Sequence, residues 1–341
     1  KNGIKIKHTM TSPRYNYMGS TDIKVSNYWK NWLKDFIKIE GDASFREFYR
    51  NPKKKSIIIV ANKEKNKNLL IYDAINKILI KNKILAPKLI SQNYLNNYIE
   101  IQDFGNQTFF KILKNKNIKK YFVFKKIIKL LNKIQSIKDN QIKNFNNQLY
   151  RVQEYNNKIL FNETKLFCDW YVPKRLSKSK CYKFNKKFKL EITNLLSKLN
   201  YKNDTFVHRD FHVSNLMYYK KKIALIDSQD ALIGNIAYDL ASLIDDVRLK
   251  TSNDLKEKVF KFYLKTNKKI ILKKFKQDFE ILSVLRNLKI IGIFTRLAVR
   301  DNKKKYLKLI PYAWQMINHR MKTQNNFKGL MLLFKNDFPN L

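Results

Sequence analysis

Glycine and proline are scarce in this chain, with seven and six residues among 341. A long flexible or stiffened linker needs a local concentration of these residues, so the composition excludes such a linker between the folded parts. The length and a hydrophobic content of 44% favour one or two domains with a substantial core.

Cysteine is scarcer still, because the chain contains only Cys168 and Cys181. Two thiols do not make a disulfide scaffold, and neither has companions at the spacing of a zinc site. We interpret both as structural thiols in a reducing compartment.

No apolar run is long enough to predict a membrane span. The most apolar stretch, residues 279–299, contains Arg286, Lys289 and Arg296, which is typical of an amphipathic or buried helix. The start of the chain has no apolar signal core, so a cytoplasmic location without a membrane partner is expected. Residues 1–27 are polar and aperiodic, which leaves three interpretations open: an N-terminal extension, a fragment of a preceding segment, or disordered chain.

Acidic residues are few: 27 Asp and Glu face 71 Lys and Arg, for a formal charge of +44. Such a charge attracts polyanions, so a nucleic-acid-binding protein is one hypothesis. The lysines, however, are spread along the chain, and the other abundant residues (Asn, Ile, Phe and Tyr) share their AT-rich codons. We therefore attribute most of the charge to genome composition and solvated surfaces, and do not expect nucleic acid as the partner.

Two segments carry recognisable chemistry. Residues 207–216 read Val-His-Arg-Asp-Phe-His-Val-Ser-Asn-Leu, and residues 226–230 read Ile-Asp-Ser-Gln-Asp. His-Arg-Asp with Asn five positions after the Asp is the spacing of a kinase catalytic loop. Asp210 is the candidate base that orients an attacking hydroxyl, and Asn215 and Asp227 are candidate Mg²⁺ ligands.

The short apolar runs on either side of a Lys-Lys-Lys turn, residues 216–219 and 223–226, predict a β-hairpin. This hairpin would return Asp227 to the side of Asn215. The alternative is a polar loop in which His208 and Asp210 only cap or pair locally, and the number of matching positions disfavours it.

Hydrophobic spacing divides the rest of the chain into a mixed first part and a helical second part. The first part is predicted to contain helices over 28–39 and 69–84 and strands over 43–50, 56–61, 88–91 and 98–102. In the second part only the hairpin is expected to interrupt helices over 109–137, 149–172, 184–200, 236–249, 254–266, 275–299 and 302–323.

The chain resembles the aminoglycoside phosphotransferase and choline kinase superfamily, and within it most closely the bacterial anomeric kinases of N-acetylmuramate and N-acetylglucosamine. Four stretches carry the resemblance, namely a strand–turn–strand over residues 41–50, a hinge over 99–108, a helical insert over 163–171 and the catalytic core over 208–240. The subgroup usually has Phe at Ser228 and Pro at Asn235. Ser228 removes an aromatic wedge behind the metal loop and Asn235 is expected to loosen the following turn, but neither removes a ligand.

The resemblance implies an α+β, two-lobed protein-kinase-like fold. Residues 28–105 would form a nucleotide-binding N-lobe around a small antiparallel sheet. Residues 106–341 would form a larger, mostly helical C-lobe with the catalytic hairpin, the metal site and the acceptor site.

The implied activity is ATP- and Mg²⁺-dependent phosphorylation of a small molecule, with an N-acetyl amino sugar and its anomeric hydroxyl, in cell-wall recycling, as the leading hypothesis. The expected partners are a nucleotide and this acceptor, bound by a monomer. Phosphorylation of an aminoglycoside or choline-like acceptor stays open, as does a degenerate kinase fold that binds nucleic acid. A protein kinase is disfavoured, because only about a dozen residues separate Asp227 from the next helix, too few for an activation loop.

The phosphate-binding part of the nucleotide site is the least defined. The chain has no Gly-x-Gly-x-x-Gly loop and no Walker A sequence. We expect Gly41 and Ser44 to form the turn over the phosphates, although an ordinary hairpin turn would look the same. The third strand has no lysine, so Arg46, Arg50 and Lys63 stay open as the basic residue that pairs with the phosphates.

At the hinge, Gln102 and Phe104 are expected to bond adenine through their backbone. Asp103 begins an Asp-Phe-Gly sequence that elsewhere binds metal. It lies about a hundred residues before the catalytic Asp, whereas a metal carboxylate should follow the catalytic loop. Its side chain is therefore not expected to bind metal.

On the acceptor side, Glu163 and Asp169 are substrate candidates because the resemblance places their helix near the sugar. Asp230 would either bind sugar hydroxyls or support the metal loop, and the sequence does not separate the two. The remaining polar residues of the core are expected to support the site: Asp239 and His208 brace the catalytic loop, Arg209 is peripheral, and His212 faces phosphate.

Overall fold

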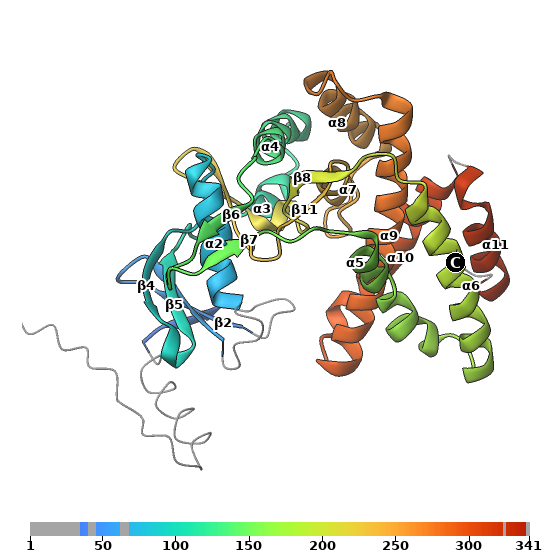
Figure 1. The fold of residues 1–341 in the computed structure, drawn as a ribbon, viewed down its shortest axis with the longest axis horizontal. Coiled ribbons are helices and arrows are strands. Elements are labelled where there is room, and N and C mark those ends of the chain that lie inside the picture. The colour runs from blue at the N-terminus through green and yellow to red at the C-terminus, as the bar shows by residue number, and fades with distance from the viewer. Residues whose placement is uncertain (1–34, 40–45, 62–67, 323–324, 339–341) are drawn as a thin grey trace, which may run out of the picture.

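The computed structural model describes residues 35–39, 46–61, 68–322 and 325–338. Figure 1 shows a sheet with one long helix at one end of the molecule and a mass of helices at the other. Some predictions made from the sequence concern residues outside the described part, namely residues 1–27, Gly41, Ser44 and Lys63.

The smaller part is a five-stranded antiparallel sheet in the order β1-β2-β3-β5-β4. Alternate residues of the central strand face opposite sides of it, as a strand's two-residue period requires. Ile57 and Ile59 pack with Leu69 and Tyr72 of the helix, whereas Ile58 packs on the other face. The elements are β1 (Ile37–Ile39), β2 (Glu47–Asn51), β3 (Ser56–Val60), α2 (Asn68–Lys81), β4 (Leu89–Asn93) and β5 (Tyr98–Gln102).

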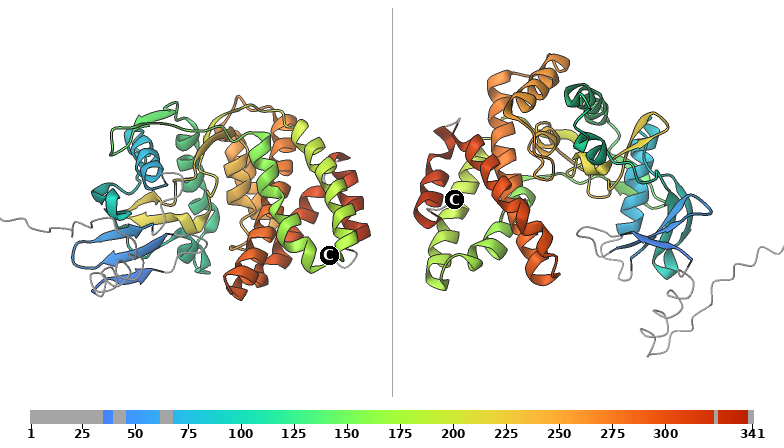
Figure 2. Two further views of the ribbon diagram at one scale, coloured as in Figure 1. Left: turned by 60° about the horizontal axis from the view of Figure 1, so that its bottom comes forward. Right: turned by 180° about the vertical axis from the view of Figure 1, so that it is seen from behind.

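The larger part is mostly helical and contains the main hydrophobic core. Figure 2 shows its helices stacked away from the sheet in both views. Its helices and strands are α3 (Phe109–Lys114), α4 (Lys120–Gln135), β6 (Gln141–Lys143), β7 (Leu149–Arg151), α5 (Asn157–Thr164), η2 (Phe167–Tyr171), α6 (Lys178–Ser197), β8 (Asn203–Val207), η4 (Val213–Asn215), β9 (Leu216–Tyr219), β10 (Lys222–Leu225), β11 (Leu232–Asn235), α7 (Tyr238–Ile244), α8 (Asn253–Thr266), α9 (Leu272–Arg300), α10 (Ile310–Met321) and α11 (Lys328–Asp337). Short 3-10 turns add η1 (Tyr94–Asn96), η3 (Val172–Lys174), η5 (Lys304–Leu309) and η6 (Asn325–Phe327).

Four expectations about the elements were wrong. The helix expected over residues 109–137 is two helices, α3 and α4. The end of the helix expected over residues 28–39 is strand β1, whose Ile-Lys-Ile sequence pairs with β2. The helix expected over 149–172 begins as strand β7. The hairpin is not alone among the C-terminal helices, because β6 pairs with β7 and β8 pairs with β11.

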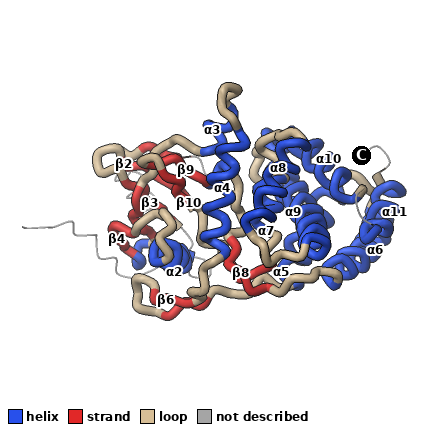
Figure 3. The backbone as a smooth tube through the Cα atoms, turned by 90° about the horizontal axis from the view of Figure 1, so that it is seen from above, coloured by secondary structure: helices blue, strands red, loops and turns tan. Residues whose placement is uncertain are grey.

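The hairpin β9–β10 lies where the two parts of the molecule meet, beside the sheet (Figure 3). Single bridges join Ala224 to Leu85 after α2 and Met217 to Thr108 before α3. Phe104 packs on the hairpin in a small apolar cluster, with its ring centroid 4.9 Å from that of Tyr219. Within the described residues, no helix is long and apolar enough to cross a membrane.

Candidate active site

The hairpin brings two distant segments together. A two-residue turn with positive φ at Lys220 and Lys221 closes it, as tight hairpins require. Leu216 then pairs with Leu225, and the backbone N–H of Ile226 donates to the Asn215 carbonyl at 3.1 Å. Asp227, the next residue, therefore lies beside Asn215, which is the spatial relation expected from the sequence.

Asn215 and Asp227 offer oxygen ligands of the kind that Mg²⁺ prefers. The side-chain nitrogen of Asn215 donates to the Asp210 carbonyl at 3.0 Å, which leaves the carboxamide oxygen for a ligand. The half-exposed Asp227 takes a left-handed conformation with φ 61° and accepts a 3.0 Å bond from Gln229. No group of three or more His, Cys, Asp or Glu in the described chain could hold a metal. These two residues therefore fit an ion whose other ligands come from phosphate and water.

Asp239, at the start of α7, supports the backbone of the catalytic loop. It is fully buried, and its two carboxylate oxygens accept the backbone N–H groups of His208 at 2.7 Å and Arg209 at 3.0 Å. His208 Nε2 bonds the Ile226 carbonyl at 3.1 Å, which ties the loop to the end of the hairpin. The loop that carries Asp210 is thus held on both sides.

The two departures from the subgroup's usual residues form bonds of their own. The Ser228 hydroxyl donates to Asn76 of α2 at 2.6 Å, so a polar contact stands where the subgroup usually has an aromatic side chain. The Asn235 side chain donates to the Tyr201 carbonyl and to Asp278, and accepts from the Ala237 N–H. The expectation that Asn235 loosens this turn was wrong, because three hydrogen bonds hold it.

The surroundings of the two active-site carboxylates shift their pKa values in opposite directions. Burial alone would raise the pKa of Asp210, but the positive charges of Lys289, Arg286 and Arg209 outweigh it and hold that pKa well below its ordinary value. Burial raises the pKa of Asp227, with a further contribution from the charge of Asp210, against the opposing effect of Arg46. Asp210 is therefore ionised at any physiological pH.

Arg46 is the basic candidate that the structure brings to the metal ligands. Its guanidinium lies 3.5 Å from the Asp227 carboxylate and donates to Asn68, at the start of α2, at 3.1 Å. Arg50 instead binds Asp103, which also accepts the N–H of Gly105 at 2.7 Å.

At the hinge, the N–H of Gln102 donates to the Lys88 carbonyl at 2.9 Å. A hollow of about 550 Å³ lies just after the hinge in the chain, and it is lined by Asn106, Gln107, Lys111, Ile112, Asn115 and Ile118.

Glu163 is the centre of a buried cluster on the acceptor side. Its carboxylate binds Arg209, the Tyr155 hydroxyl and, at 2.9 Å, Lys289 of α9. The Arg209 guanidinium also lies over the Tyr155 ring, 5.0 Å from its centroid, and donates to the Asp230 carbonyl at 3.0 Å. The expectation that Arg209 is peripheral was wrong, because this side chain links the catalytic loop to Glu163.

The other two substrate candidates are exposed. Asp169 pairs with Lys165 one helical turn away. Asp230 accepts a 2.8 Å bond from Gln229 and lies 4.0 Å from Arg209. Substrate binding by either residue stays a prediction, and Asp230 touches residues of the metal loop and of the catalytic loop alike.

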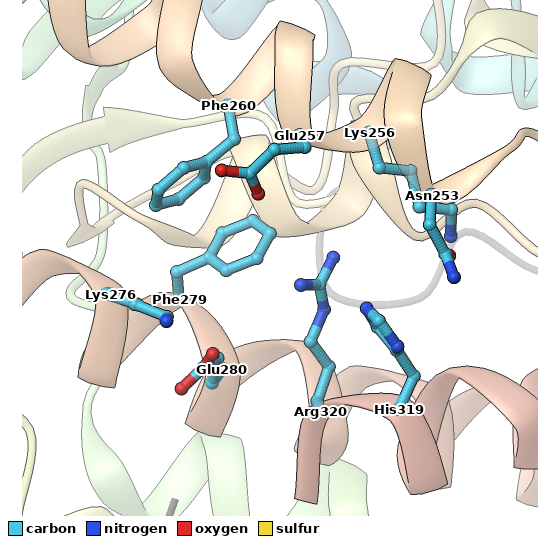
Figure 4. Close-up of a pocket in the computed structure, with 9 residues that line it drawn as sticks. All are labelled: Asn253, Lys256, Glu257, Phe260, Lys276, Phe279, Glu280, His319 and Arg320. Atoms are coloured by element: carbon cyan, nitrogen blue, oxygen red, sulfur yellow. The ribbon is translucent and has the colours of Figure 1, made fainter. Parts of the chain in front are cut away.

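A second cavity lies among α8, α9 and α10 (Figure 4). In it Arg320 reaches the buried Asp245, which it binds through two nitrogens at 2.7 and 3.0 Å. The cavity measures about 40 Å³, enough for water but far below the size of a ligand pocket. We therefore do not count it as a substrate site.

Sequence reasoning missed the part that α9 plays in this site. Arg286 and Lys289 were noted only as charges that spoil a membrane span. Arg286 is buried, Lys289 is only slightly exposed, and both charges act on Asp210. Their spacing of three residues within an apolar helix was the available signal, since it places two cations on one buried helical side.

Comparisons with known proteins agree with this geometry. The family model described as the phosphotransferase enzyme family matches residues 35–269. The chain is 25% identical over 324 residues to the N-acetylmuramate/N-acetylglucosamine kinase of Neisseria meningitidis, covering 89% of this chain and 92% of that protein. It is 25% identical over 284 residues to the protein of the same name from Pseudomonas aeruginosa, covering 81% of each.

Solved structures agree in fold. A choline/ethanolamine kinase family protein from Mesorhizobium loti matches with a TM-score of 0.60 at 10% identity, over 91% of this chain and 99% of that one. Amicoumacin kinase hAmiN in complex with AMP-PNP matches with a TM-score of 0.61 at 12% identity, over 88% and 94%. The kinase-like fold and the resemblance stated from the sequence are confirmed.

Proposed function

The chain belongs to the phosphotransferase enzyme family as a small-molecule kinase, and we propose that it transfers a phosphoryl group from ATP to the anomeric hydroxyl of an N-acetyl amino sugar. The observation that carries the proposal is the meeting of Asp210, Asn215 and Asp227 at one end of the hairpin. The names of the curated relatives, which are matched over 92% and 81% of their length, support the choice of acceptor. Cell-wall recycling in the cytoplasm, by a monomer, is the context that we propose for this reaction.

In this proposal Asp210 orients the acceptor hydroxyl and accepts its proton as the bond to phosphorus forms. Asn215 and Asp227 hold Mg²⁺, which would neutralise charge on the phosphates. Arg46 approaches the same phosphates from the sheet, while the hinge at Gln102 and Phe104 receives adenine. Most of the rate enhancement would come from positioning and charge neutralisation, as in other phosphoryl transfers.

The charges around Asp210 favour a neutral or anionic acceptor. Arg209, Arg286 and Lys289 all act on this carboxylate, and Glu163 already binds two of these cations. A polycationic aminoglycoside would meet repulsion here, because like charges close together in a site are costly. We therefore rank aminoglycosides and choline-like molecules below amino sugars, and propose that Glu163 positions the loop.

The test is an acceptor screen with Mg-ATP, followed by location of the phosphate on the product by NMR. Asp210→Asn should lower kcat by about 10²–10⁴-fold, the usual contribution of a positioned base, with little change in nucleotide affinity. Asp254→Asn is the matched control, because this exposed carboxylate pairs only with Lys258 among the contacts of the described residues. Absence of turnover with every amino sugar, aminoglycoside and choline-like acceptor would reject the proposal, and so would full activity of Asp210→Asn.

A further inference from the structure

Buried polar atoms without a protein partner gather beside the catalytic loop. Such atoms are costly, so a native site that holds several of them usually holds a ligand or water as well. In the described part of the chain, atoms of this kind on charged or titratable side chains include His208 Nδ1 and a group of four: Arg209 Nε, His212 Nδ1, Asp246 Oδ2 and Arg286 Nη1. Arg209 and His212 belong to the loop between β8 and β9, Asp246 follows α7, and Arg286 lies on α9.

Arg286 is the unusual member of the group. Its side chain is buried, with 3% of its surface exposed, and Nη1 has no partner among the described residues. On the same side of α9, Ser283 donates to Asp245 at 2.6 Å and Lys289 binds Glu163 at 2.9 Å. Because residues three apart lie on one helical side, Arg286 projects between these two contacts.

The neighbouring buried cations are all neutralised at short range. Lys289 binds Glu163, Lys256 binds Asp245 at 2.8 Å, and Arg320 binds the same Asp245. No ion pair of Arg286 occurs within 4.0 Å in the described chain, although its charge acts on both Asp210 and His212. A buried guanidinium without a direct ion pair raises the free energy of the folded protein, and a bound anion would lower it.

The planar guanidinium of arginine matches a carboxylate with two parallel hydrogen bonds. We infer that Arg286 binds a carboxylate of the acceptor and thereby makes the enzyme selective for a carboxylated amino sugar over the neutral one. The inference rests on the proposed function, and it concerns which acceptor that site takes. N-acetylmuramate carries a carboxylate on an ether side chain of the ring, whereas N-acetylglucosamine is otherwise similar and uncharged.

The test compares three acceptors: N-acetylmuramate, its methyl ester and N-acetylglucosamine. For the wild type, kcat/KM should be at least about tenfold higher for the free acid than for the other two, because hydrogen bonds to a charged group contribute strongly. Arg286→Met should reduce kcat/KM for the free acid by about 10–100-fold more than it reduces kcat/KM for the other two acceptors, mainly through KM. Arg286→Lys keeps the positive charge but cannot form the two parallel hydrogen bonds, so it should give an intermediate loss of kcat/KM for the free acid.

Arg296→Met is the matched control, since it removes the same kind of charge from a later turn of α9, near Arg300 and Asp301. It should leave the preference among acceptors unchanged. Calorimetric binding of the free acid, with a non-hydrolysable ATP analogue present, repeats the comparison without turnover. Binding of the ATP analogue alone detects any variant that fails to fold.

Equal kcat/KM of the wild type for all three acceptors would overturn the inference and leave the proposed function intact. A uniform loss for all three acceptors in Arg286→Met would also overturn it, because it would mean that Arg286 only balances Asp246 within the fold. If neither sugar is phosphorylated by the wild type, the proposed function itself is rejected.

Discussion

Two aspartates of the catalytic loop region show how surroundings assign roles to identical side chains. Asp239 is buried beneath the loop, and this burial raises its pKa to about 6 although two backbone N–H groups favour its ionised form. Asp210 is also enclosed, but Lys289 and the neighbouring arginines keep its pKa low. The first is suited to support a backbone and the second to accept a hydrogen bond from a hydroxyl at neutral pH.

His212 should make folding stability depend on pH. Burial, followed by repulsion from Arg248, lowers its pKa to about 3 from an ordinary 6.5. Between these values the unfolded chain binds the extra proton, so the free energy of unfolding falls as the pH is lowered. From pH 6.5 to about pH 5 we expect a loss of about 2 kcal/mol attributable to this residue.

Urea unfolding of the wild type and of His212→Asn, at about pH 7 and pH 5, measures this contribution as a difference between the two proteins. The wild type should lose about 2 kcal/mol more than the variant over this interval. Protonation of Asp239 changes the free energy of unfolding in the opposite direction. It does so equally in both proteins, so its contribution cancels in the comparison. Identical pH dependence of the two proteins would show that His212 becomes protonated without cost in the folded state.

Sequence reasoning at this scale succeeded where the signal was local. Asp210, Asn215 and Asp227 were named from one loop and one hairpin, and the structure places Asp227 beside Asn215. Contacts from distant segments left no such signal. The ion pair of Glu163 with Lys289 joins α5 to α9, and nothing in either segment alone marks the other as its partner.

At the scale of elements, prediction followed periodicity. The long helices α2, α8 and α9 were expected close to their observed bounds, because each carries apolar residues at helical spacing. The pair β8–β11 was missed, since β11 is a four-residue strand with the sequence Leu-Ile-Gly-Asn and has no alternation to read. Its pairing with β8 depends on tertiary contacts and not on local propensity.

The crossing of α9 with η2 depends on Gly292. A Cβ added at this position would lie 2.6 Å from the backbone nitrogen of Phe167 and would overlap the Leu166 carbonyl group. Backbone atoms cannot turn aside as a side chain does, so Gly292→Ala should force α9 and η2 apart. We expect a loss of about 3 kcal/mol in the free energy of unfolding, the upper part of the range for overpacking.

Gly329→Ala is the matched control for this change. The three atoms nearest to its added Cβ all belong to the carboxylate of Glu191, the far end of a flexible side chain that can rotate away. Chemical denaturation should therefore place this variant within about 1 kcal/mol of the wild type, with helix propensity slightly in its favour. A Gly292→Ala protein as stable as this control would mean that α9 shifts without cost.

At the scale of the whole molecule, the hinge and the catalytic hairpin form one packed unit. Phe104 lies against Met217 and Ala224, and the strand bridges from Leu85 and Thr108 end on the same hairpin. The segment after β5, where we propose that adenine binds, and the hairpin that leads to Asp227 are therefore joined through apolar contacts. This arrangement suits a site in which phosphates must be held between the two parts.

The excess of positive charge is the strongest global property of the chain. A net charge of +44 on 341 residues repels itself in the compact state more than in the expanded unfolded chain. Added salt screens this repulsion, because the Debye length falls to about 10 Å at 0.1 M. Raising NaCl from about 0.02 M to about 0.3 M should therefore increase Tm by about 1–3 °C, equivalent to roughly 1–2 kcal/mol of screened repulsion.

Differential scanning fluorimetry without nucleotide measures this effect, and sucrose at matched osmolality separates screening from solvent exclusion. Sucrose should reproduce little of the shift at these concentrations. A Tm that falls with NaCl would mean that local attractions, such as the pairs of Glu163 and Asp245, outweigh the repulsion among the many lysines. The placement of opposite charges would then matter more to the stability of the fold than the net charge does.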